Sequence, residues 1–238
     1  MPIPTHTIRC TKNERIAKDV YDVRFTKPEG FTFKAGQFVL FDVALIEKPT
    51  DMQTRALSIA SLPDEHELGF IVKLKPGGRM SRWIAEVLKA GMEAKMKGPF
   101  GNFVLDRTTD KEYFFIATSA GVAPFRPMIV EALKAGEMRK IDLVFGVRSE
   151  EDLFWEQELA VLAKEHKNFS LHIGLSQPNE SWKGHRGRVQ TLAPAIAKDF
   201  SKKNVYICGS PDMTNELKKI SLEEWGIEKK DLHVEGYI

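Results

Sequence analysis

The sequence contains very little cysteine. Only Cys10 and Cys208 occur among its 238 residues. An iron-sulfur cluster or a structural zinc site built from four cysteines needs more thiolates than this chain offers. Any such centre would therefore have to lie on another protein. A disulfide between the two cysteines is not expected in a reducing compartment.

Long apolar segments and an excess of charge of one sign are also lacking. No run approaches the ~18 apolar residues that a membrane-spanning helix needs, and the start of the chain, Met1 to His6, lacks the basic and apolar regions of a secretory signal. The formal net charge is only +2, which gives no reason to expect a nucleic-acid partner. We expect a cytoplasmic protein with neither a membrane nor a nucleic acid as partner.

The chain does have enough apolar sequence for two modest cores, because 42% of its residues are hydrophobic and 29% are charged. Residues 8–105 consist of short β-rich runs between turn residues, which favours an antiparallel β-barrel. One helix is expected there, from Met80 to Leu88 with Ser81 as its cap, covering a mouth of the barrel. The β-rich runs are 20–25, 38–43, 58–60 and 69–74.

A different rhythm follows the polar stretch at 106–111. Apolar strands alternate with helices, a pattern typical of a parallel sheet covered by helices. The sequence thus predicts a barrel domain over residues 1–106 and an α/β domain over residues 112–238. In the α/β domain, strands are expected at 113–117, 141–146, 169–175, 204–208 and 232–235, and helices at 127–135, 153–166, 189–197 and 213–225.

Two motifs in the first half suit a phosphate ligand. The segment Arg55-Ala56-Leu57-Ser58 supplies a guanidinium, which binds phosphate in a forked geometry. The segment Gly77-Gly78-Arg79-Met80-Ser81 joins glycines to a predicted helix start, where backbone N–H groups point toward an anion. Taken alone, Arg55 and Ser58 are also consistent with ordinary strand residues after a loop.

Two further motifs lie in the second half. The segment from Ser119 to Pro124 stands between an apolar strand and a helix, the setting of a dinucleotide-binding turn. The segment from Cys208 to Met213 ends a later strand and turns into a helix, which places Cys208 at the carboxyl edge of the sheet, where ligands of open α/β sheets bind. The plainer interpretations are a generic strand-to-helix turn and a buried, unreactive thiol.

In this order and at these separations, the four motifs resemble the ferredoxin-NADP reductase superfamily, from about Ile8 to Tyr237. The resemblance implies that the first pair of motifs binds FAD and the second pair binds NADH or NADPH. Arg55 would then pair with the flavin phosphate, and Ser58 would form a hydrogen bond near flavin N5. Cys208 and Glu235 would belong to the nicotinamide pocket, and Tyr237 would lie over the flavin.

The resemblance also implies a full set of site residues, with no metal site. The catalytic group would be Ser58, Cys208, Glu235 and Tyr237. The cofactor-binding group would be Arg55, Ala56, Leu57, Ser58, Gly77, Gly78, Arg79, Met80, Ser81, Thr118, Gly121, Val122, Pro124, Arg148, Ser176, Arg186, Arg188, Cys208, Gly209 and Met213.

The chain departs from the family pattern at several of these positions. Leu57 stands where the family usually has an aromatic residue, and Ala56 where it often has proline. Loss of a ring stacked on the flavin removes ~1 kcal/mol of binding, so we expect a flavin that is held less tightly or stacks on another ring. Ser119 replaces the usual first glycine of the nucleotide turn, and Ala120 a threonine, which leaves the approach of the pyrophosphate to Gly121.

The choice of nucleotide depends on contacts to the 2′-phosphate of NADPH, which favours arginine and lysine. Relatives that use NADPH commonly have Ser-Arg where this chain has Ser176-Gln177, so one cation is missing. Arg148, Arg186 and Arg188 remain in family positions. The pattern slightly favours NADH or dual use.

The resemblance implies that hydride passes from the nicotinamide to FAD and that single electrons then leave to a separate acidic ferredoxin, flavodoxin or iron-sulfur protein. A local charge of +5 between residues 71 and 97 would steer such a partner. A solvated basic face explains the same charge. Other readings remain open: a reductase of free flavin, a flavin-carrying subunit of a larger dehydrogenase, and a nucleotide-binding regulatory module.

Overall fold

The computed structural model describes residues 4–237, which divide into two compact units. Unit 1 comprises the chain up to Leu105 together with Ala123–Glu131, and unit 2 comprises Asp106–Val122 and the chain from Ala132 onward. These units follow contacts within the chain. The domain limits expected from the sequence, 1–106 and 112–238, remain a proposal.

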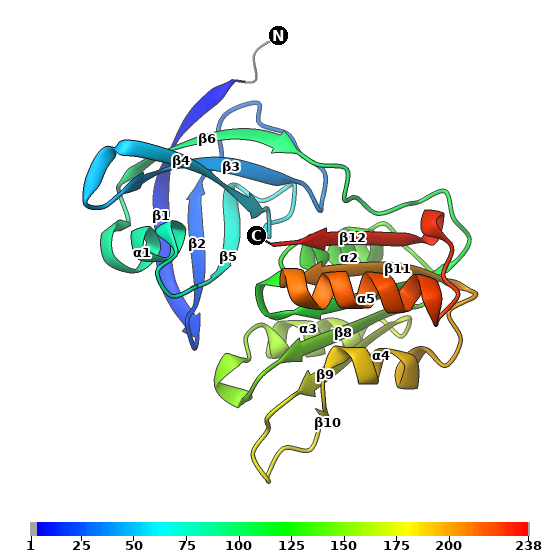
Figure 1. The fold of residues 1–238 in the computed structure, drawn as a ribbon. Coiled ribbons are helices and arrows are strands. Elements are labelled where there is room, and N and C mark those ends of the chain that lie inside the picture. Colours follow the sequence, from blue (N-terminus) through cyan, green and yellow to red (C-terminus); the bar gives the residue numbers. More distant parts are fainter. Residues whose placement is uncertain (1–3, 238) are drawn as a thin grey trace. The chain divides into compact units, whose positions relative to one another are not determined.

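Unit 1 contains a six-stranded antiparallel sheet with the order β4-β3-β6-β1-β2-β5 (Figure 1). Just after β4, the N–H group of Ala60 donates to the carbonyl of Gly69 on β5 at 2.8 Å, which links the two ends of the sheet. The predicted antiparallel barrel is thereby confirmed. Its strands are β1 (Thr5–Ala17), β2 (Val20–Thr26), β3 (Phe38–Leu45), β4 (Lys48–Ser58), β5 (Glu67–Lys73) and β6 (Glu93–Phe100).

Aromatic side chains fill the centre of the barrel. The ring of Phe41 lies 5.2 Å from those of both Phe25 and Phe70, and all three side chains are fully buried. Such tilted and edge-to-face pairs add to the stabilisation that comes from burial alone. The core therefore fixes β2, β3 and β5 relative to one another.

The helix of unit 1 begins earlier than predicted and changes its winding. Helix α1 (Arg79–Arg82) starts after Gly78 and continues as a π-helical turn, Trp83–Val87. The prediction of Ser81 as the cap was wrong, because Ser81 lies inside the helix and its hydroxyl accepts a hydrogen bond from the N–H group of Lys75 at 2.8 Å. The apolar spacing was informative nevertheless, since Met80, Ile84 and Leu88 pack into the barrel core.

Unit 2 contains a six-stranded parallel sheet with the order β10-β9-β8-β7-β11-β12, which confirms the predicted α/β architecture (Figure 1). Residues of helices α4 and α5 pack with alternate residues of β7, β8 and β11 in one apolar cluster. The strands are β7 (Glu112–Thr118), β8 (Ile141–Val147), β9 (Phe169–Leu175), β10 (His185–Arg186), β11 (Lys203–Gly209) and β12 (Leu232–Gly236), and the helices are α2 (Phe125–Lys134), α3 (Glu156–Glu165), α4 (Val189–Ala197) and α5 (Pro211–Glu223).

The predicted helix at 153–166 begins too early. A short 3-10 turn, Glu150–Asp152, comes first, and Ser149 and Asp152 cap it reciprocally. Trp155 then adopts a left-handed conformation with φ of 59°, and α3 begins only at Glu156. A left-handed residue interrupts the regular helical hydrogen bonding, so the apolar residues before it are not part of the helix.

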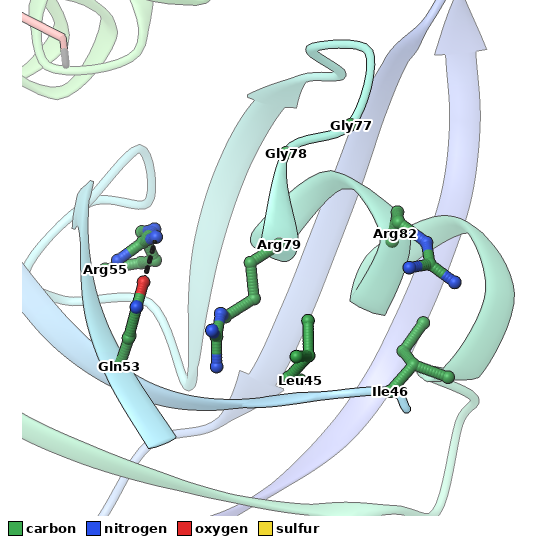
Figure 2. A pocket seen from close by; sticks show the side chains of 8 residues that line it. All are labelled: Leu45, Ile46, Gln53, Arg55, Gly77, Gly78, Arg79 and Arg82. Atoms are coloured by element: carbon green, nitrogen blue, oxygen red, sulfur yellow. Dashed lines mark hydrogen bonds between the residues drawn. The ribbon is translucent and has the colours of Figure 1, made fainter. Parts of the chain in front are cut away.

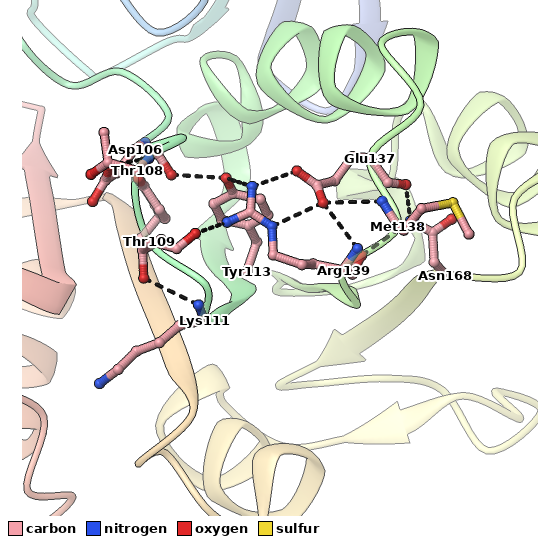
Figure 3. Close-up of polar contacts among 10 residues, drawn as sticks. Asp106, Thr108, Thr109, Lys111, Tyr113, Glu137, Met138, Arg139 and Asn168 are labelled. Carbon is pink, nitrogen blue, oxygen red and sulfur yellow. Dashed lines mark hydrogen bonds and ion pairs between the residues drawn. The ribbon is translucent and has the colours of Figure 1, made fainter.

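The polar stretch that was expected to separate the domains is firmly held within unit 2 (Figure 3). The guanidinium of Arg139 donates to the carbonyl of Thr109 and, at 2.6 Å, to the hydroxyl of Tyr113. That hydroxyl donates in turn to the carbonyl of Asp106 at 2.8 Å. Lys111 forms an ion pair with Asp231 at 2.9 Å. Residues 106–111 are therefore a structured connection.

None of the helices within residues 4–237 has the length and apolar character needed to cross a membrane.

Candidate cofactor and nucleotide sites

Unit 1 carries a pocket of about 310 Å³ beside the start of helix α1 (Figure 2). The pocket brings together four residues expected from the sequence, Arg55 from β4 and Gly77, Gly78 and Arg79 from the loop and helix start. It also includes four that sequence reasoning missed, Leu45, Ile46, Gln53 and Arg82. The strand β4 and the helix thus contribute three guanidinium groups to one concave site.

Each of the three arginines has protein partners. Arg55 donates from Nη2 to Oε1 of Gln53 at 2.6 Å. Arg79 donates from Nη1 to Oδ1 of Asp51 at 3.1 Å. Arg82 pairs with Glu86 at 3.3 Å and also with Glu47. Guanidinium groups are the side chains best suited to hold a phosphate in forked hydrogen bonds.

Other residues expected at the flavin site do not line this pocket. Ser58 is the last residue of β4 and lies buried opposite Phe38. Leu57 packs against the barrel core, and Ala56 is exposed. Met80 has its side chain in the core, while the hydroxyl of Ser81 is engaged by Lys75. The part that Ser58 would play at a flavin ring remains a prediction.

In unit 2, the 3-10 turn Ser119–Val122, which follows β7, packs very closely on the end of β11 at the carboxyl edge of the sheet. A Cβ atom added at Gly121 would lie 2.2 Å from the carbonyl oxygen of Cys208, and one added at Gly209 would lie 2.2 Å from Oγ1 of Thr118. Both positions therefore require glycine. Val122 and Met213 are buried in unit 2, and the Met213 side chain lies against Gly209, while Pro124 is buried in unit 1. Such close backbone approach at this edge is the geometry in which α/β proteins bind dinucleotides.

Cys208 lies in the same region and has two neighbours that the sequence also singled out. The pairing of β11 with β12 sets Cys208 opposite Glu235, and the N–H group of Tyr237 donates to the carbonyl of Gly209 at 2.9 Å. Burial raises the pKa of the Cys208 thiol well above its usual value, and the charge of Glu235 raises it further, although a hydrogen bond with the Tyr237 side chain opposes this. The thiol is thus protonated at neutral pH.

The arginines expected to contact the nucleotide differ in how they are engaged. Arg148 follows β8, and its Nε donates to Oε1 of Gln177 at 2.8 Å. Arg186 donates from Nη2 to three carbonyls of its own loop, those of Asn179, Glu180 and Trp182. Arg188 is exposed at the N-cap of α4. Ser176, which the sequence also placed at the nucleotide, follows β9, and its N–H group donates to the carbonyl of Val147.

These arrangements fit the ligands that the sequence suggested. Three guanidiniums around one pocket of unit 1 suit a phosphorylated flavin, and the carboxyl edge of the parallel sheet in unit 2 is where open α/β sheets bind their ligands. A protonated thiol beside a carboxylate offers no nucleophile, so Cys208 is suited to packing and orienting a ligand. When bound, the flavin would supply the redox chemistry that these side chains lack.

Comparison with known proteins agrees with an FAD-binding and an NAD-binding domain. A family model described as oxidoreductase FAD-binding domain matches residues 7–105, and one described as oxidoreductase NAD-binding domain matches residues 115–219. The chain is 33% identical over 227 residues to ferredoxin--NADP reductase B of Sorangium cellulosum, covering 92% of this chain and 91% of that protein.

Two further relatives extend the comparison. The glycine betaine monooxygenase reductase subunit of Pseudomonas aeruginosa is 30% identical over 98% of this chain, which spans 64% of that subunit. The structure of a ferredoxin NADP+ reductase from Neisseria gonorrhoeae, with bound FAD and NADP, matches with a TM-score of 0.85 at 20% identity, covering 98% of each chain. The chain therefore belongs to the ferredoxin-NADP reductase superfamily and is an NAD(P)H-dependent flavoprotein reductase that uses FAD.

Proposed function

We propose that this reductase takes hydride from NADH, or from NADH and NADPH alike, and passes electrons one at a time to a separate acidic redox protein of the ferredoxin type. Two relatives support the choice of acceptor, one named a ferredoxin--NADP reductase and one named the reductase subunit of a monooxygenase. The two cysteines of the chain cannot form a four-cysteine cluster. The iron-sulfur centre would then lie on the partner.

The distribution of charge in unit 1 carries this proposal. Of the seven basic residues between 71 and 97, Arg79, Arg82 and Lys97 are paired with carboxylates. Lys75, Lys89 and Lys95 are exposed, and no described residue offers them a carboxylate within ion-pair distance. Exposed charges of one sign accelerate encounter with an oppositely charged protein, and salt weakens the effect.

The docking role can be tested by charge reversal. Replacing Lys89 and Lys95 by glutamate should slow electron transfer to an acidic ferredoxin at low salt by about tenfold, and the difference should shrink at high salt. Lys164→Glu on helix α3 is the matched control. Equal losses for both sites would remove residues 75–95 from the docking surface.

Within the site, each residue would have a limited task. Arg55 and Arg79 would hold the flavin phosphate, and Ser58 would hydrogen-bond the flavin ring. Gly121 and Gly209 would let the segments that bind the nucleotide pack closely, Cys208 and Glu235 would shape the nicotinamide pocket, and Tyr237 would lie over the flavin. The remaining expected contacts, Thr118, Val122, Pro124 and Met213, would support these residues.

The way in which the arginines are engaged supports the proposed use of NADH. Gln177 accepts from Arg148, and Arg186 is committed to three carbonyls of its loop. Fewer guanidinium donors are then free for a 2′-phosphate, and an added cation should restore them. Gln177→Arg should raise the efficiency with NADPH relative to NADH, and an unchanged ratio would remove this position from the choice of nucleotide.

The decisive experiment is anaerobic stopped-flow spectroscopy of the FAD-loaded protein after mixing with NADH and, separately, with NADPH. Rapid bleaching of the flavin absorption by NADH, followed by reoxidation on addition of a ferredoxin, is the expected result. Bleaching of the flavin without electron transfer to any iron-sulfur protein would overturn the proposed acceptor.

One observation favours a second candidate, a reductase that treats flavin as a substrate. Leu57, which stands at the family's usual stacking position, is turned toward the barrel core. A flavin that lacks a stacked ring is held less tightly. Loss of flavin during gel filtration, together with turnover of added free flavin, would support this candidate over the first.

A further inference from the structure

Two of the arginines that line the pocket of unit 1 form ion pairs with carboxylates that are not themselves part of its lining. Asp51, on β4, accepts from Arg79 at 3.1 Å, and Glu47, in the turn between β3 and β4, pairs with Arg82. Glu86, one helical turn further along, pairs with the same Arg82 at 3.3 Å. Three carboxylates therefore pair with two of the three arginines that line the pocket, and two of these carboxylates come from a single hairpin.

These ion pairs engage the guanidinium groups of Arg79 and Arg82, two of the residues that line the pocket. The side chain of Arg79 is only 10% exposed, whereas that of Asp51 is 38% exposed, so the arginine is largely enclosed and the carboxylate remains within reach of solvent. Hydrogen bonds from Arg82 lower the pKa of Glu47 below its usual value, which keeps this carboxylate charged at neutral pH. Arg55, the third arginine of the pocket, donates to the amide of Gln53 and the carbonyl of Thr54, and within the described residues it pairs with no carboxylate.

A phosphate that enters such a site meets a region close to neutral. To form forked hydrogen bonds with Arg79 or Arg82, it must displace a carboxylate or accept its repulsion at short range. The free energy gained from the arginines is then reduced by the free energy of the existing ion pairs. Removing a carboxylate while keeping the arginine should raise the affinity for phosphate.

We propose that Asp51 and Glu47, both carried by the β3–β4 hairpin, set the flavin affinity of the reductase by competing with the flavin phosphate for Arg79 and Arg82. The inference rests on the proposed placement of the flavin phosphate in this pocket. It assigns to the hairpin a role in specificity, because the competition weakens phosphorylated flavins and leaves riboflavin, which has no phosphate, unaffected. A cofactor held in this way exchanges more readily.

The test measures the binding of FMN and of riboflavin to the full-length protein after removal of flavin, by quenching of flavin fluorescence. Asp51→Asn should lower the Kd for FMN by about two- to fivefold, the range expected for one partly exposed ion pair. Glu47→Gln should act in the same direction, and the effect should fade in high salt. The Kd for riboflavin should not change in either variant.

Glu93→Gln is the matched control. It removes the same charge from an exposed ion pair in the same barrel, but its partner Arg9 does not line the pocket, whereas Arg79 and Arg82 do. Its Kd for FMN should equal that of the wild type. A gain in this variant as large as that in Asp51→Asn would overturn the local competition in favour of a general effect of net charge.

Several other results would also decide the matter. Weaker FMN binding by Asp51→Asn would show that Asp51 positions Arg79 for the phosphate, and it would overturn the competition. An equal change in the Kd values for FMN and riboflavin would also overturn the competition, because riboflavin has no phosphate. Should Asp51→Asn fail to fold, Glu47→Gln carries the test, because that side chain is 58% exposed. Wild-type protein that binds neither flavin would overturn the flavin site itself, whereas normal binding with unchanged variants would overturn the competition alone.

Discussion

At the scale of single residues, the end of strand β11 shows how neighbours determine what a reactive group does. Cys208 is fully buried, lies opposite Glu235 and contacts Tyr237. Burial and the nearby carboxylate favour the neutral thiol. We therefore interpret Cys208 as a small side chain that shapes the pocket, in contrast to the thiolate nucleophiles of other enzymes.

Replacement of Cys208 tests this interpretation. Cys208→Ala should slow the reduction of the flavin by NADH by about tenfold, or 1.4 kcal/mol of activation free energy, and should leave the FAD content unchanged. Because burial and Glu235 raise the pKa of the thiol, the rate in the wild type should show no thiol titration near neutral pH. Stopped-flow rates across pH give both results, and Cys10→Ala is the control. An unchanged rate would reduce Cys208 to packing alone.

Gly121 provides a test of the close approach beside it. Gly121→Ala would place a Cβ atom 2.2 Å from the carbonyl oxygen of Cys208, and relief of this contact would have to move either the 3-10 turn Ser119–Val122 or strand β11. Overpacking of this kind costs about 1–3 kcal/mol of unfolding free energy. Urea denaturation measures the loss. Gly69→Ala, whose added Cβ would meet its nearest neighbour at an ordinary 3.5 Å, should cost far less, and equal costs would contradict the tight contact.

At the scale of elements, the helix of unit 1 depends on a side chain from a distant strand. The change to π-helical winding is marked by the N–H group of Leu88, which donates to the carbonyl of Trp83. Asn13 on β1 donates from Nδ2 to the carbonyls of Ile84 and Leu88, each at 2.8 Å. Carbonyls at a helix end lack hydrogen-bond donors inside the helix. The Asn13 amide supplies a donor to two of them.

Removal of the Asn13 amide should therefore be costly. Asn13→Ala should lower the free energy of unfolding by about 1–3 kcal/mol, because two hydrogen bonds are lost at once. Chemical denaturation provides the measurement. Glu14→Ala is the control. The side chain of Glu14 is 66% exposed and forms a surface ion pair with Lys12. A cost no greater than that of the control would mean that water replaces Asn13 fully.

The sequence predicted the elements of unit 2 better than those of unit 1 for a physical reason. Strands buried on both faces of a parallel sheet appear as continuous apolar runs, and β8 and β11, which are buried along their whole length, begin and end within one residue of the predicted limits. Strands β1 and β4 were missed or shortened because exposed polar residues dominate them. The left-handed Trp155 also has no sequence signal, since an aromatic residue rarely adopts that conformation.

At the scale of the whole molecule, ion pairs between distant parts of the chain determine much of what sequence reasoning missed. The motifs Arg55–Ser58 and Gly77–Ser81 indicated a phosphate site, but Asp51 and Glu47 lie 28 and 35 residues from the arginines they meet. Buried Asp142 in unit 2 is another case: burial alone would raise its pKa, but His172 and Lys140 hold the pKa below its usual value. Such partners are far apart in the sequence and come together only in the folded chain, so the sequence motifs do not reveal them.

The clearest pH dependence belongs to Glu137, whose hydrogen bonds with Arg139 lower its pKa from 4.5 to about 2. The folded protein binds this proton more weakly than the unfolded chain does. The resulting stabilisation is therefore complete above pH 4.5 and is lost as the pH falls toward 2. Through Arg139, the same carboxylate also supports the contacts to Tyr113 and Thr109 that hold residues 106–111 (Figure 3).

Glu137→Gln should accordingly lower the free energy of unfolding at pH 7 by about 2 kcal/mol. The difference from the wild type should narrow steadily below pH 4.5, because the wild-type carboxylate then gains its proton as well. Urea denaturation of both proteins from pH 7 down to the lowest pH at which the wild type folds provides the comparison. Glu223→Gln, in an exposed pair with Lys219, should show almost no difference at any pH. A difference for Glu137→Gln that stays constant with pH would mean that shape and packing, rather than charge, account for its contribution.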